Sequence, residues 1–150
     1  MALSSDYSII VQTIVDLLKT DTSLRLKDVF YGDQELIPRV PAVTVEGGLK
    51  RRSYNQTGLQ TNVDLSVFIT VFHGGVKDKS VLQKDIDERT QLIEAALHGN
   101  PKLTTTSNTG GYVIHSLVVS NEPGFITRGR TVFLASRLTW EGLVKERIGV

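Results

Sequence analysis

Apolar residues near the start of the chain follow a helical spacing. Between Tyr7 and Thr20 they recur at steps of three and four residues, and Ser5 or Asp6 is placed to cap the helix. The apolar positions are Tyr7, Ile10, Val11, Ile14, Leu17 and Leu18. This pattern predicts an amphipathic helix with one buried face. The residues that follow, up to Pro41, predict a connector with at most a brief strand over residues 29–31.

Two later segments alternate apolar and polar residues as strands do. The first is 42–46, and Gly47 and Gly48 follow it directly. The second, 62–72, places five apolar residues on one face: Val63, Leu65, Val67, Ile69 and Val71. Its other face carries Phe68 and Phe72, so we expect a helix or another subunit to cover part of that face. Residues 48–62 between the two strands are expected to form a long flexible loop.

The second half of the chain predicts a helix followed by a hairpin. Residues 77–98 have a helical apolar spacing, a cap at Asp78 or Ser80, and a stop at residues 99–101. Strands at 112–120 and 131–141 flank the turn-like residues 121–130. We therefore expect one α+β domain over residues 1–150: a mainly antiparallel sheet of about four strands with two principal helices packed on one face. The tail 144–150 is expected to fray or to reach a neighbouring subunit.

Composition narrows the possible functions. The chain has 150 residues, 17 basic and 16 acidic side chains, a net charge of +1 and no cysteine. This balance disfavours a protein that binds nucleic acid mainly by neutralising phosphates, and thiolate chemistry is excluded. The N-terminal apolar stretch is interrupted by polar residues, and no stretch approaches the roughly 20 apolar residues that cross a bilayer. We expect neither an export signal nor a membrane partner.

Motifs for catalysis are missing from the sequence. His73, His98 and His115 are the only histidines, and none has a second ligand at a metal-binding spacing. The glycine pairs match no phosphate-binding loop, and no serine lies in a G-x-S-x-G elbow. We therefore expect no enzyme activity, no cofactor and no metal.

Basic residues gather in two predicted connections. Such loops are often functional, although solvated charge is an equally good explanation for each cluster alone. Nucleic-acid binding would require aromatic residues interleaved with the cations, and a single tyrosine gives little support. The residues are Lys50, Arg51, Arg52 and Tyr54 in the first connection, and Arg128 and Arg130 in the second.

The order of these elements resembles the tail terminator proteins of long-tailed bacteriophages, the lambda-like family. The segments that carry the resemblance are VPAVTVEGG, the long loop, NVDLSVFITVFHGG, the charged helix KDKSVLQKDIDERTQLIEAAL, and the hairpin YVIHSLVVS/TVFLASRLTWE. The resemblance implies a homo-hexameric ring that caps the head-proximal end of the tail tube, stops tube polymerisation and provides the head-attachment surface. It implies no catalytic residues. Related neck, head–tail connector and tail-completion proteins share this order, and a nucleic-acid-binding module is a further alternative.

The resemblance also suggests partners and contact residues. The partners would be further copies of the chain, the tail tube protein and the head connector, with DNA at most passing through the lumen, in the virion and in the host cytoplasm during assembly. The loop 48–62 would dock on the tube or the adjacent subunit through its basic residues, with Arg128 and Arg130 as a second contact. Candidates for subunit packing, or for packing against a helix, are Phe68, Phe72 and Phe133.

Overall fold

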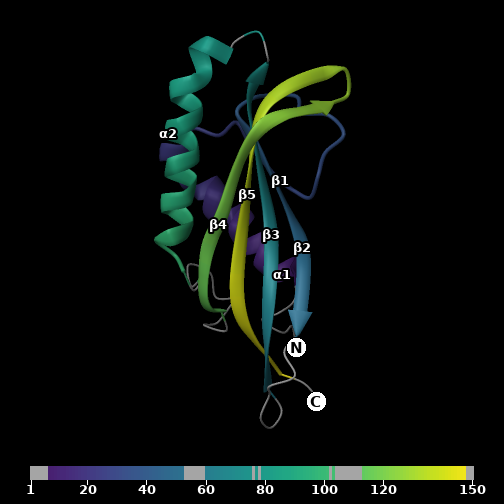
Figure 1. Cartoon of the computed structure of the whole chain (residues 1–150), viewed down its shortest axis with the longest axis vertical. Helices are drawn as coiled ribbons and strands as arrows, with labels where there is room; N and C mark the ends of the chain where they lie inside the picture. Colours follow the sequence, from purple (N-terminus) through teal and green to yellow (C-terminus); the bar gives the residue numbers. More distant parts are fainter. Residues whose placement is uncertain are drawn as a thin grey trace.

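A computed structural model describes residues 7–52, 60–75, 77, 79–101, 103 and 113–147. The elements are α1 (Tyr7–Thr20), the short 3₁₀ helix η1 (Thr22–Leu24), β1 (Asp28–Tyr31), β2 (Ala42–Arg52), β3 (Gln60–Gly75), α2 (Lys79–His98), β4 (Val113–Arg128) and β5 (Thr131–Arg147). The strands form one sheet in the order β1-β2-β3-β5-β4 (Figure 1). β1 pairs with β2 in parallel, and the other pairs are antiparallel. The predicted α+β class is confirmed, with five strands in place of about four.

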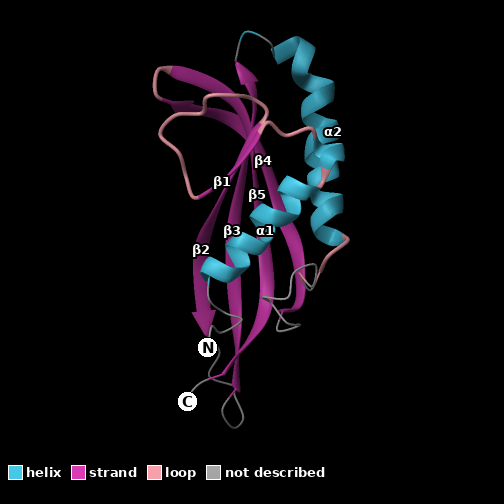
Figure 2. Ribbon diagram, turned by 180° about the vertical axis from the view of Figure 1, so that it is seen from behind, coloured by secondary structure: helices cyan, strands magenta, loops and turns pink. Residues whose placement is uncertain are grey.

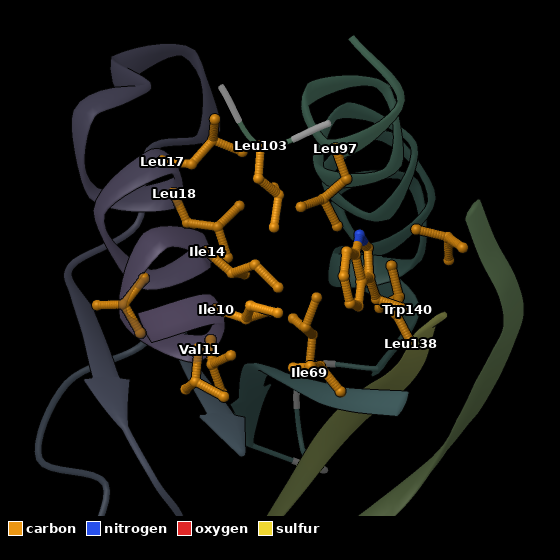
Figure 3. Packing of buried hydrophobic residues seen from close by; sticks show 14 of the residues in the cluster. Ile10, Val11, Ile14, Leu17, Leu18, Ile69, Leu97, Leu103, Leu138 and Trp140 are labelled. Atoms are coloured by element: carbon orange, nitrogen blue, oxygen red, sulfur yellow. The ribbon is translucent and has the colours of Figure 1, made fainter. Parts of the chain in front are cut away.

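Both helices pack against the same face of the sheet (Figure 2). The apolar stripe of α1 meets the alternate valines, leucines and isoleucines of β2 and β3, and α2 contributes Ile93 and Leu97. Trp140 from β5 is fully buried among the side chains of both helices (Figure 3). The apolar faces of the helices, which repeat every 3.6 residues, and those of the strands, which repeat every two, thus pack together in one main core, as the sequence predicts.

A smaller core lies on the opposite face, at the end of the sheet where β4 turns into β5. The rings of Phe72 and Phe133 meet edge to face with centroids 5.5 Å apart. Ile37, Ala42 and Ala135 complete the cluster, and Val40 packs against it. The covering residues belong to the β1–β2 connection, residues 32–41. Phe72 and Phe133 are therefore buried inside one chain under this connection, whereas the sequence pattern predicted that they pack against a helix or against another subunit.

The predicted loop 48–62 is shorter than expected. β2 continues through Arg52 and β3 begins at Gln60, so Lys50, Arg51 and Arg52 lie on a strand; residues 53–59, with Tyr54, lie outside the described residues. The pairing of β2 with β3 shifts between Gly47 and Lys50. A bulge of this kind absorbs an extra residue without ending the strand, and so the glycine pair does not end β2.

The second connection and the tail were also predicted too long. β4 runs through Pro123 and Gly124 to Arg128, which leaves only Gly129 and Arg130 in the turn. Proline is compatible with β4 because β4 is an edge strand, whose outer N–H groups need no ladder partner. β5 extends to Arg147, so residues 144–147 of the predicted tail are strand; residues 148–150 lie outside the described part.

Candidate functional site

The two basic clusters lie at opposite ends of the sheet. Arg51 pairs with Asp64 of β3 at one end, whereas Arg128 pairs with Thr131 beside the β4–β5 turn at the other (Figure 1). Lys50 and Arg52 accompany Arg51 on β2, although the side chain of Arg52 is not among those described. The structure therefore does not combine the predicted contact residues into one basic surface.

Arg128 already has partners within the chain. Its guanidinium donates to both carboxylate oxygens of Asp33, at 3.0 Å each from Nη2, and it lies 5.7 Å from the centroid of the Phe72 ring. Asp33 belongs to the β1–β2 connection. A two-pronged ion pair of this geometry fixes the orientation of both groups, so Arg128 holds the connection onto the sheet. Arg130, in the turn, is exposed.

The other end of the same sheet face has no covering segment among the described residues. Leu49, Leu117 and Val119 there expose 57%, 54% and 45% of their surface, values unusual for apolar strand residues inside a fold. They line a shallow groove of about 470 Å³, which we call the open-face groove. Its lining is Leu49, Arg51, Asp64, Leu65, Ser66, His115, Leu117, Val119, Glu141, Gly142 and Leu143. Four strands, β2, β3, β4 and β5, supply these residues, so only the strand register brings them together.

The charges around the groove are mixed. Arg51 stands opposite Asp64 in the strand register, and Glu141 lines the same groove. Next to the groove, the Arg137 guanidinium lies 3.8 Å from the centroid of the Phe68 ring and covers it. A platform for single-stranded nucleic acid needs exposed aromatic faces within a basic surface. The described residues around the groove do not form such a platform.

A polar cluster lies under α2 on the helix-covered face. The buried ring of His73 is 2.9 Å from Ser136 Oγ through Nε2 and 3.2 Å from Arg89 Nη1 through Nδ1. Arginine can only donate, so Nδ1 accepts and the ring proton sits on Nε2, where it is donated to Ser136. His73 in this tautomer cannot take the proton of Ser136 as a nucleophilic site requires. The cluster therefore serves to hold α2 on the sheet.

Burial and charge make His73 a weak base. Burial lowers its pKa to about 4, the Arg89 cation acts in the same direction, and Asp87 opposes the shift. Burial likewise lowers the pKa of Arg89. Sequence analysis left His73 without a role. Its position two residues after Val71 continues the helix-facing alternation of β3, and that signal could have predicted its burial.

The end of α2 is fixed to the edge strand. His98 Nε2 accepts the N–H of Val118 at 3.1 Å, and Ser116 Oγ donates to the carbonyl of Pro101 at 2.8 Å. Val118 lies at a register shift of the edge strand β4, and His98 gives its N–H a partner outside the sheet. β4 thus has two bulges, a proline and a docked helix end, which are known protections of an exposed edge.

No group of three or more His, Asp or Glu side chains in the described residues is placed to hold a metal ion. No helix in that part of the chain is long and apolar enough to cross a membrane. No protein-family model and no curated protein sequence matches the chain.

Proposed function

We propose that the chain is a structural protein of phage tail assembly, a tail terminator. Copies of it form a ring on the head-proximal end of the tail tube, stop tube polymerisation and present the surface to which the head attaches. The elements whose order suggested this family are present in the folded chain: the helix α1, the antiparallel strands β2 and β3, the charged helix α2, and the closing hairpin of β4 and β5.

The open-face groove is the observation that supports an assembly role. Apolar strand residues exposed to about half of their surface are expected where another protein covers them. No described segment covers the end of the sheet where the groove lies, and charged residues of both signs line it. Such a mixed surface is typical of the interfaces between separately folded subunits.

The length of the strands supports the same role. β3 has 16 residues and β5 has 17. At about 3.3 Å per residue each strand spans on the order of 50 Å, well beyond the strand lengths that one small core usually covers. The helices and the β1–β2 connection cover different parts of this sheet, and no other described segment covers the remainder.

The test is whether the purified protein forms rings and ends tubes. Light scattering over a range of concentrations gives the native mass, and negative-stain imaging shows whether any assembly has a central hole. Adding the protein to polymerising tail tube protein encoded by the same genome should shorten the tubes and leave a ring on one end. Tubes of unchanged length without an end ring would contradict the proposal, and binding to the head connector alone would favour a neck protein.

A further inference from the structure

The turn between β4 and β5 extends beyond its neighbour in the sheet. β3 ends at Gly75, which pairs with Phe133, so Thr131 and Val132 pair only with β4. We call residues 128–131 the hairpin tip. Leu36 of the β1–β2 connection rests on this tip: a Cβ on Gly129 would lie 2.7 Å from Leu36 Cδ2. Leu36 itself is 69% exposed, so an apolar side chain stands uncovered beside the turn.

The hairpin tip carries one unneutralised positive charge. Arg128 is paired with Asp33, whereas Arg130 is exposed and has no ion pair with any described residue. Glu35, exposed and next to Leu36 in the connection, also has no ion pair with a described residue, so a negative charge lies beside the tip. Leu36 therefore lies against Gly129, the residue that directly precedes the exposed Arg130.

The open-face groove has features complementary to the tip: an apolar rim and carboxylates. Its rim is apolar, with Leu49 and Leu117 more than half exposed. The lining carries one guanidinium, Arg51, and two carboxylates, Asp64 and Glu141, so negative charge is in excess there. Glu141 and Leu117 are opposite each other in the β4–β5 register, so the carboxylate stands directly beside the apolar rim.

We propose that the hairpin tip of one copy binds in the open-face groove of the next copy, with Arg130 meeting Glu141 and Leu36 meeting the rim at Leu117. This contact supplies the subunit interface of the proposed ring and rests on that proposed function. The tip and the groove lie at opposite ends of the sheet (Figure 1). Two different patches on one molecule make a heterologous contact, which gives a closed ring where the rotation between copies allows it and an open filament otherwise.

Cysteine cross-linking tests this contact directly, because the natural chain contains no cysteine. Two single variants, Arg130→Cys and Glu141→Cys, are mixed under mild oxidation, with one of them tagged so that mixed dimers can be identified. The mixed disulfide should exceed that of a control mixture by about tenfold or more, because disulfides form only where two Cα atoms come within about 7 Å. The control pairs Glu141→Cys with Lys84→Cys, an exposed position on α2.

The outcomes separate this contact from the proposed function. A mixed disulfide well above the control supports the contact. Equal cross-linking in both mixtures, or none, overturns it, whether the protein is monomeric or associates through another surface. Rings and capped tubes formed by the natural chain would then leave the terminator proposal intact, whereas a specific cross-link without rings or capping would overturn that proposal and leave the contact. Unchanged thermal unfolding of each variant verifies that it is folded.

Discussion

Trp140 and Gly142 show how one buried side chain restricts a neighbouring position. They lie on the same face of β5, and Trp140 is fully buried in the main core. A Cβ at Gly142 would lie 2.9 Å from Trp140 Cζ3 and 3.0 Å from Cζ2, inside any tolerable contact. The indole therefore occupies the space that a side chain at 142 would need. Since it is the only tryptophan, its fluorescence reports directly on this core.

His73 should make the stability of the protein depend on pH. Its pKa is about 4 in the folded protein and 6.5 in the unfolded chain, so unfolding takes up a proton between these values. The contribution of His73 to the free energy of unfolding is then complete above pH 6.5, and it is lost as the pH decreases toward 4. Between pH 6.5 and 5 the loss from this residue should be about 2 kcal/mol.

The variant His73→Gln isolates this contribution. Glutamine can still accept from Arg89 and donate to Ser136, but it does not titrate. Urea unfolding followed by Trp140 fluorescence at pH 7, 6 and 5 should show a smaller loss of stability in the variant than in the natural chain. Equal losses in the two proteins would show that His73 is not the group responsible.

At the level of elements, the β1–β2 connection is held to the sheet by two ion pairs. Arg39 donates to Asp28 at 2.6 Å, and Arg128 donates to Asp33 from the other edge of the sheet. Both pairs are partly exposed, so solvent screening limits their contribution. The Arg128 pair also lies over the Phe72 ring, in the smaller core. It should therefore matter more for the position of the connection than for global stability.

Replacing Arg128 by Met should loosen the connection. The variant keeps an apolar side chain over Phe72 but loses the ion pair, and we expect a destabilisation of about 1 kcal/mol. Hydrogen exchange of Gly32, whose N–H donates to Val45 at 2.7 Å, should become faster while the exchange of β3 stays unchanged. The matched variant Lys84→Met, which removes the exposed pair with Glu88, should leave both unchanged. Uniformly faster exchange would mean that Arg128 supports the whole fold.

The elements also show what a sequence pattern can and cannot predict. α1, α2 and the middle of β3 were predictable because their apolar periods are uninterrupted. The ends of β2 and β4 were not, since Gly47 and Gly48, and Pro123 and Gly124, are typical of turns but lie here at a bulge and on an edge strand. The open-face groove was beyond prediction, because no sequence pattern gives the register that places Leu49, Leu117 and Glu141 together.

At the scale of the whole molecule, a tip-and-groove contact has a consequence that a symmetric dimer contact lacks. Each copy offers its hairpin tip to one neighbour and its open-face groove to the other, so blocking the tip or the groove of a copy stops growth on that side only. Arg130→Glu blocks the tip by reversing its charge. Leu117→Glu blocks the groove because Leu36 of the incoming tip would then have to cover a carboxylate in place of the leucine on which it packs, and this carboxylate also repels the reversed charge of the Arg130→Glu tip. Each variant alone should be monomeric.

A mixture of these two variants should form a dimer and nothing larger. The intact tip of the Leu117→Glu chain can enter the intact groove of the Arg130→Glu chain, and both remaining ends are then blocked. Sedimentation should show a species of twice the 16.5 kDa subunit mass at equal concentrations, whereas each variant alone stays at one subunit mass. If the mixture stays monomeric while the natural chain forms rings, the ring closes through other surfaces. If it forms rings, neither position lies in the interface that closes them.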